Sequence, residues 1–190
     1  MRYFQFRYYL PLFLIQAITF FLPDFIIFMK LRGFISSFFV KKCGQNLMIG
    51  RDVTFYNPQN LYLGDNVYIS KSVWINAYKK INIGNEVLIA SNVVMTSGKH
   101  TYKNQSFRNG DPIGIQIEIK DGTWIGANSV ISAGSKIGKG CVVSACSIVT
   151  GKFSDYIMIG GNPAKYIKPL KWKTYYLLVL SYLQKQEQFQ

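Results

Sequence analysis

A six-residue repeat runs through most of this 190-residue chain and constrains its fold more than any other feature. Between residues 44 and 164 an apolar residue, here called an anchor, recurs mostly at six-residue steps: Ile49, Phe55, Leu63, Ile69, Ile75, Ile83, Ile89, Met95, Ile119, Ile125, Ile131, Ile137, Val143, Val149 and Ile159. The residue two before an anchor is commonly small or β-branched, and glycine follows six anchors: Gly50, Gly64, Gly84, Gly126, Gly138 and Gly160.

This pattern predicts a β-solenoid. Period-two alternation in a short strand turns the anchor and the small residue to the same, inner side, and a glycine after the anchor can turn the corner. Three six-residue faces give a coil of about 18 residues, and coils must stack because one coil alone buries too little apolar surface.

The irregular steps mark one corner of the predicted solenoid. The steps from Phe55 and from Ile75 are eight residues long and lie twenty residues apart, so they fall on the same corner of successive coils. The long break after Met95 is the next occurrence of that corner, and the step from Val149 to Ile159 reads as a later one. Loops on a rigid scaffold are favoured places for function, so we expect the site on this edge.

Composition narrows the class of protein. Hydrophobic residues make up 49% of the chain and charged residues 16%, which excludes a disordered protein. Three scattered cysteines do not make a disulfide scaffold or a zinc cluster, and a reducing compartment is the simpler expectation. The net charge of +13 comes without a helix-turn-helix, RNA-recognition or zinc-finger pattern, so we expect no nucleic-acid partner.

Two apolar segments flank the repeats. Residues 1–43 contain a 20-residue stretch without lysine or arginine, but Pro11, Pro23 and Asp24 interrupt it and basic residues flank it. This favours helices on an anionic membrane surface over a bilayer span, with a helical cap on the core as the alternative. Residues 169–190 are expected to form a C-terminal helical tail. The repeats, residues 44–168, form the central domain.

The largest insertion, residues 96–118, carries His100, the only histidine of the chain. An imidazole with a pKa of about 6.5 can take up a proton at neutral pH. Its position at the start of the largest loop on the insertion edge makes His100 a candidate general base. A zinc site with three histidine ligands, as in a γ-class carbonic anhydrase, is excluded because there is one histidine.

Three segments resemble the hexapeptide-repeat acyltransferases, in particular the galactoside, maltose and capsular-polysaccharide O-acetyltransferases. They read IGNEVLIASNVVMTSGKH (83–100), TWIGANSVISAGSKIGKG (123–140), and SACSIVT with GGNPAKYIK (144–150 and 160–168). The resemblance implies a left-handed parallel β-helix, a homotrimer with sites between subunits, acetyl-CoA as donor and no metal. It also implies that His100 deprotonates the acceptor, which attacks the thioester directly.

The resemblance also carries over donor-side positions. These contact or approach the donor in the family: Ala127, Ala145, Thr150, Lys152 and Lys165, with Lys168 a further basic residue. The family usually has lysine directly after the threonine, whereas Gly151 intervenes here, which puts the phosphate contact of Lys152 in doubt. Cys146 stands where the family has glycine and is expected to pack. Trp124 is expected to fill a structural layer beside the site, with a direct contact to the donor as the alternative.

The acceptor side departs from the family. Ser70 stands where sugar-acetylating relatives have a substrate asparagine, and Tyr78 where they have an aspartate, so we expect an acceptor other than a simple galactoside. The apolar, basic N-terminus resembles members that acetylate polysaccharide precursors on a lipid carrier, at the inner face of the cytoplasmic membrane. Acyl transfer to an amino sugar and a non-enzymatic structural solenoid remain open, and Asp111 and Glu118 are the nearby carboxylates that could orient His100.

Overall fold

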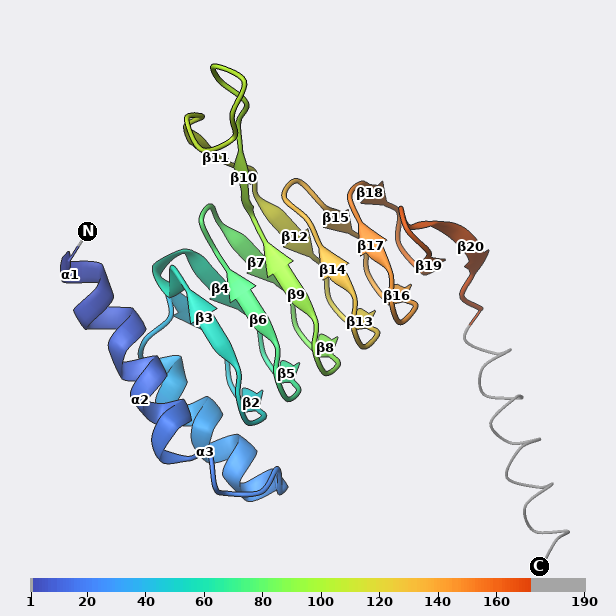
Figure 1. Cartoon of the computed structure of the whole chain (residues 1–190). Coiled ribbons are helices and arrows are strands. Elements are labelled where there is room, and N and C mark those ends of the chain that lie inside the picture. Colours follow the sequence, from blue (N-terminus) through green and yellow to red (C-terminus); the bar gives the residue numbers. More distant parts are fainter. Residues whose placement is uncertain (1, 172–190) are drawn as a thin grey trace, which may run out of the picture.

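The computed structural model describes residues 2–171 of the chain. The predicted tail at 169–190 therefore lies largely outside the described residues. From β1 to β19 the chain winds as a three-sided solenoid of parallel strands, confirming the predicted fold class (Figure 1). Each turn of the chain passes through three sheets, which we call A, B and C.

Sheet A has six strands: β1 (Lys42–Cys43), β4 (Leu61–Leu63), β7 (Ile81–Ile83), β12 (Ile117–Ile119), β15 (Lys136–Ile137) and β18 (Lys152–Phe153). Sheet B has seven: β2 (Met48–Ile49), β5 (Tyr68–Ile69), β8 (Leu88–Ile89), β13 (Trp124–Ile125), β16 (Val142–Val143), β19 (Ile157–Gly160) and β20 (Lys165–Pro169). Sheet C has five: β3 (Thr54–Tyr56), β6 (Trp74–Asn76), β9 (Val94–Thr96), β14 (Val130–Ile131) and β17 (Ile148–Val149). All neighbours pair in parallel except β19 and β20, which are antiparallel.

The core confirms the predicted anchors. Every anchor is buried, with an exposed fraction of 3% or less. The small or β-branched residues two positions earlier are buried as well, including Val67, Thr123 and Ser135. One step was wrong: Phe153 pairs with Ile137 and serves as the anchor of β18. The interval from Val149 to Ile159 is thus a shortened corner followed by an ordinary step, and not a further insertion.

The glycines after the anchors have a different role from the predicted one. The left-handed backbone positions of the corners fall elsewhere, for example at Asn66, Asn92, Asn128 and Cys146, with φ between 56° and 60°. A Cβ added at Gly64 would lie 2.6 Å from the carbonyl carbon of Gly84 in the next coil. These glycines are therefore required by the close approach of successive coils, not by an unusual φ.

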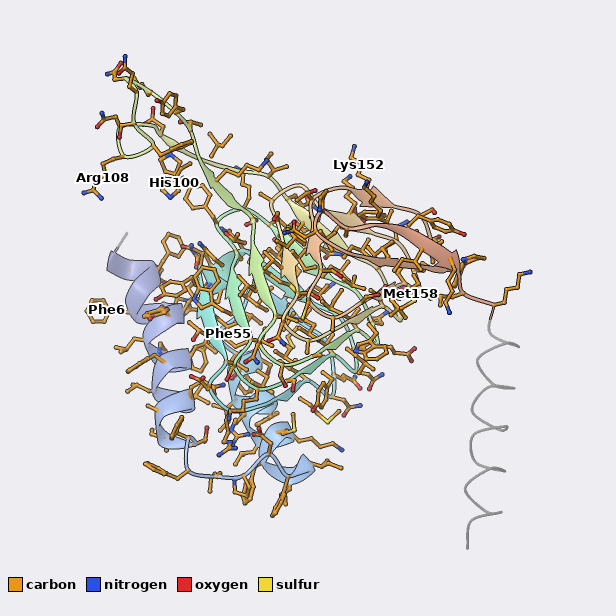
Figure 2. All side chains as sticks on the ribbon, turned by 45° about the vertical axis from the view of Figure 1, so that its right-hand side comes forward. Phe6, Phe55, His100, Arg108, Lys152 and Met158 are labelled. Atoms are coloured by element: carbon orange, nitrogen blue, oxygen red, sulfur yellow. The ribbon has the colours of Figure 1, made fainter. Side chains whose placement is uncertain are left out.

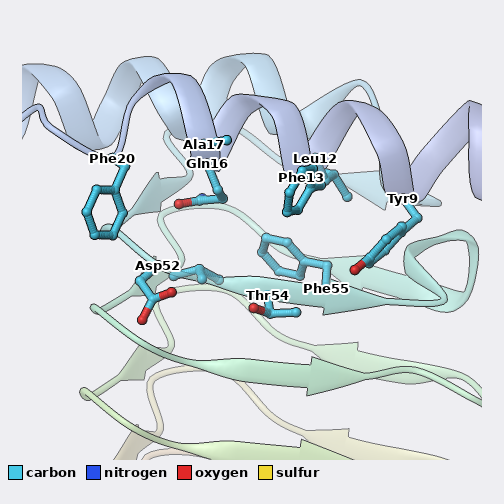
Figure 3. Close-up of a pocket in the computed structure, with 10 residues that line it drawn as sticks. Tyr9, Leu12, Phe13, Gln16, Ala17, Phe20, Asp52, Thr54 and Phe55 are labelled. Carbon is cyan, nitrogen blue, oxygen red and sulfur yellow. The ribbon is translucent and has the colours of Figure 1, made fainter.

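The N-terminal segment forms helices on the first coil. They are α1 (Arg2–Phe4), the π-helix η1 (Gln5–Tyr9), α2 (Leu10–Ile18) and α3 (Ile26–Ser37), and a short 3₁₀-helix η2 (Pro58–Asn60) follows β3. The chain breaks between α2 and α3, in the segment that contains Pro23, as that proline predicted. Figure 3 shows α2 lying over β3, with Leu12 and Phe13 above Phe55 and a pocket between the two elements.

Arg32 joins the helices to the solenoid. Its side chain is fully buried and donates hydrogen bonds to the carbonyls of Thr19, Leu22 and Ile49, at 3.2, 2.6 and 3.4 Å. It also pairs with Asp24 at 2.9 Å, and Asp24 accepts a bond from the backbone N–H of Arg51 at 3.0 Å. The buried cation is thus fully hydrogen-bonded, as burial of a charge requires.

The opposite side of these helices is apolar and exposed. More than half of the exposed large hydrophobic side chains in the described residues lie before residue 39, among them Phe6, Phe13, Ile18, Phe21, Ile27 and Phe34. Arg7, Lys30 and Lys41 are exposed on the same segment. Within residues 2–171, no helix has both the length and the apolar character needed to cross a bilayer.

Candidate functional site

His100 lies on a two-stranded ribbon that projects from one corner of the solenoid (Figure 1). Strands β10 (Gly98–His100) and β11 (Pro112–Gly114) pair antiparallel, with His100 opposite Pro112. The ribbon belongs to the corner between sheets C and A, here called the CA corner, as the long insertion predicted. The histidine side chain is exposed to solvent.

The base of the ribbon is fixed by the corner of the preceding coil, residues 77–80. The buried Ser97 Oγ donates to the carbonyl of Lys79 and accepts from its backbone N–H, both at 2.8 Å. Tyr78 packs against the ribbon, since a Cβ added at Gly98 would lie 3.2 Å from the Tyr78 Cβ. Its hydroxyl donates to the carbonyl of Pro112 at 3.2 Å. Tyr78 therefore supports the strand pair that carries His100.

The immediate surroundings of His100 are a shallow depression in the loop. Its lining consists of His100, Phe107, Arg108, Gly110 and Pro112. Figure 2 shows Arg108 and His100 extending from the same part of the loop. Sequence reasoning missed Arg108, because an arginine in a polar loop gives no signal of its own. Among the described residues that line the depression, Arg108 is the one cation and none is a carboxylate.

Neither carboxylate considered from the sequence orients His100 in the described chain. Glu118 points along sheet A and pairs with Lys136 at 3.8 Å. At Asp111 the backbone carbonyl accepts a bond from the Thr101 hydroxyl at 2.7 Å, which closes the loop. Among residues 2–171, no three His, Cys, Asp or Glu side chains lie close enough together to hold a metal ion.

The donor-side residues divide between different places. Ala127 and Ala145 stack at the corner between sheets B and C, the BC corner, where the Cys146 N–H donates to the Ala127 carbonyl at 2.9 Å. Ser70 lies at this corner too, with its hydroxyl 2.8 Å from that of Ser91. Thr150 and Lys152 lie on either side of the last CA corner. One chain therefore does not bring His100 and the two alanines to the same corner.

The remaining predicted residues are accessible. Lys165 and Lys168 are exposed on β20, near the C-terminal end of the solenoid. Cys146 is exposed, so the expectation that it packs was wrong, and its φ of 59° places it in the left-handed region that glycine adopts most easily. Trp124 lies on β13 of sheet B and is 47% exposed on its outer face.

The other two cysteines are unsuited to nucleophilic chemistry. Burial, with a contribution from Asp65, raises the pKa of the Cys43 thiol to about 11. Burial also raises the pKa of Cys141, which is a core residue. A thiol with a raised pKa is protonated at neutral pH and is a poor nucleophile. The described site thus offers an exposed imidazole as its acid–base group.

The repeats match a known family. Residues 116–151 match the family described as bacterial transferase hexapeptide (six repeats). No curated protein sequence matches the chain significantly.

Solved structures resemble the chain over most of its length. A maltose O-acetyltransferase from Clostridium difficile 630 is 27% identical, with a TM-score of 0.62 over 69% of this chain and 68% of that one. A hexapeptide-repeat acetyltransferase from Vibrio cholerae O1 biovar eltor, complexed with acetyl coenzyme A, is 23% identical, with a TM-score of 0.75 over 86% and 87%. A mutant of AntD, an N-acyltransferase from Bacillus cereus crystallised with dTDP and coenzyme A, is 20% identical, with a TM-score of 0.59 over 77% and 92%.

The Vibrio cholerae and Bacillus cereus structures are less than 25% identical to this chain, so their similarity concerns the fold alone. The matched repeats and the maltose O-acetyltransferase agree with the predicted resemblance: residues 116–151 carry hexapeptide repeats of the bacterial transferase type, and the fold is similar to that of a solved acetyltransferase.

Proposed function

We propose that this protein transfers an acetyl group from acetyl-CoA to a hydroxyl group of a saccharide, in the synthesis of a surface polysaccharide. The observation that carries the proposal is the position of His100, an exposed imidazole on a ribbon anchored to a rigid solenoid of acyltransferase type. A structural solenoid has no need of such a ribbon.

His100 acts as the general base in this proposal. Its imidazole takes the proton of the acceptor hydroxyl while the hydroxyl oxygen attacks the carbonyl carbon of the thioester. The bond between that carbon and the CoA sulfur then breaks, and the imidazolium returns its proton to the departing thiolate. The products are an acetyl ester and free CoA, and no covalent enzyme intermediate is needed.

The donor-side surface fits a CoA thioester. Ala145 is exposed beside Ala127, and two small side chains leave backbone accessible to an extended ligand at the BC corner. Lys152, Lys165 and Lys168 are exposed cations suited to phosphate groups. Because His100 projects from another corner, we infer that the ribbon of one copy reaches the BC corner of the next copy in a homotrimer.

The first test is the His100→Ala variant in an assay of thiol release from acetyl-CoA. We expect the rate to fall by about 10²–10⁴-fold, the usual contribution of a general base. Lys103→Ala on the same loop is the control and is expected to keep the rate. Turnover of His100→Ala at the wild-type level would exclude the role of His100. A panel of saccharides and amino sugars decides between hydroxyl and amine acceptors.

We also propose that the N-terminal helices lie on the anionic inner face of the cytoplasmic membrane. Exposed aromatic and aliphatic side chains beside exposed cations are the features of an interfacial helix. The acceptor would then be a lipid-linked saccharide held at the same surface.

Substitution tests this membrane proposal better than deletion, because Leu12, Met29 and Arg32 are buried in the fold. Phe20, Phe21 and Phe25, which are 50%, 88% and 65% exposed, can be changed to serine together. We expect binding to phosphatidylglycerol vesicles to fall at least about tenfold. Serine at Tyr166 and Ile167, exposed on β20, is the matched control. Wild-type protein that does not sediment with anionic vesicles contradicts the proposal.

A further inference from the structure

A groove lies on the edge of the solenoid from which the His100 ribbon projects. The CA corners stack along this edge: residues 57–60 form the first, residues 77–80 the second, and the ribbon emerges from the third. Phe4, Tyr9, Tyr56, Asn57, Pro58, Gln59 and Tyr78 line the groove, here called the CA-edge groove. It therefore runs from the N-terminal helices to the coil next to the ribbon.

One end of the groove touches the ribbon. Tyr78 lines the groove and also donates its hydroxyl to the carbonyl of Pro112, the residue that pairs with His100. Stacked coils are separated by about 4.8 Å, so the first CA corner lies about 10 Å from the third. A ligand in the groove would thus lie beside an acceptor group at His100, on the side toward the helices.

The lining defines the chemistry of the ligand. Tyr56 and Tyr78 are 41% and 40% exposed, and the rings of Tyr9 and Tyr56 stack with centroids 5.2 Å apart. The amide of Gln59 makes no hydrogen bond with another described residue, so it is available as both donor and acceptor. None of the seven described lining residues is charged.

Aromatic faces combined with amides suit uncharged sugar rings. A pyranose presents a face of C–H groups, which packs on an electron-rich aromatic face, and hydroxyl groups at its rim, which pair with amides. A lipid chain would leave the Gln59 amide without a partner, whereas the Asn57 amide already donates to Asn76 Oδ1 at 2.9 Å. An anionic ligand would meet no cation among the lining residues.

We propose that the CA-edge groove binds uncharged sugar residues adjacent to the one that is acylated. The acceptor is accordingly an oligosaccharide rather than a free monosaccharide, and its chain extends from His100 toward the N-terminal helices. This inference rests on the proposed function, and it specifies the acceptor. If the helices lie on a membrane, the groove leads from the surface that holds a lipid carrier to the reacting group.

Trp74 provides a direct readout of binding that does not require turnover. Its ring centroid lies 5.5 Å from that of Tyr56, so a sugar on Tyr56 should change its fluorescence. The experiment titrates the full chain with neutral, acidic and amino oligosaccharides of one to six residues, and Trp74→Phe identifies the signal. The test variants are Tyr56→Ala and Gln59→Ala, and Tyr166→Ala, an exposed tyrosine on β20, is the control.

We expect at least one neutral oligosaccharide to bind, and Tyr56→Ala to weaken its binding about tenfold or more. In the transfer assay, the same variant should lower kcat/KM for oligosaccharides and leave that for a monosaccharide unchanged. The inference is overturned if no neutral oligosaccharide binds, or if Tyr56→Ala binds it as tightly as Tyr166→Ala. If binding requires Tyr56 but no acyl transfer occurs, the groove stands and the proposed function fails.

Discussion

The solenoid and the N-terminal helices bury apolar residues in opposite ways. In the solenoid the predicted anchors point inward and are at most 3% exposed, and each coil covers the next. In the helices most large apolar side chains point outward, and only Leu12 and Met29 are buried hydrophobic side chains of these elements. The apolar residues of the solenoid are thus buried by neighbouring coils. The helices instead present an exposed apolar surface suited to a partner outside the chain.

Polar contacts of a buried arginine hold the N-terminal helices in place. They contribute few buried apolar groups, and the buried Arg32 supplies polar contacts to the segment after α2 and to β2. A fully hydrogen-bonded buried cation fixes one arrangement, because any shift leaves a charge unpaired in the interior. We therefore infer that the outward apolar surface is presented in a defined orientation.

The largest effect on stability should come from Arg32→Ala. Removal of the guanidinium leaves the carbonyls of Leu22 and Ile49 without their donor, while Asp24 keeps its bond from the Arg51 backbone N–H. A buried acceptor left without a partner typically costs about 1–3 kcal/mol, so the two together should cost about 2–6 kcal/mol. The free energy of unfolding, measured by urea denaturation, should fall by that amount.

Arg51→Ala is the matched control for this prediction. Arg51 also faces Asp24, but at 3.6 Å and with 34% of its side chain exposed, so its loss should cost less than about 1 kcal/mol. Equal losses of unfolding free energy in the two variants would show that the helices do not depend on the buried contact. The helices would then not differ from the solenoid in how they are held in place.

The repeating part of the fold could be predicted from the sequence because apolar residues are buried at regular intervals along the chain. Burial recurs with the same phase in each coil, so Ile89 or Ile125 is identified as core by position alone. Phe153 was missed because the preceding corner is two residues shorter, which shifts the phase. The role of Gly64 was misjudged because a close approach between coils leaves the same sequence signal as a left-handed turn.

The candidate site was predictable in part. A lone histidine in the longest insertion is visible in the sequence, and the insertion edge placed it on the correct corner. Arg108 and the support given by Tyr78 depend on how the loop folds back, which no local pattern encodes. The separation of His100 from Ala127 and Ala145 follows from the corner that each residue occupies, and a single sequence does not reveal how copies pack together.

A smaller effect is expected from Gly64→Ala, which tests the close stacking of the solenoid. The added methyl group would lie 2.6 Å from the carbonyl carbon of Gly84, so the coils must separate locally. Overpacking of this kind typically costs about 1–3 kcal/mol. Gly151→Ala is the control, since its added Cβ meets nothing closer than 3.6 Å. If urea denaturation shows the same stability for both variants, the coils yield more readily than the geometry implies, and the solenoid is not the rigid support on which the position of His100 depends.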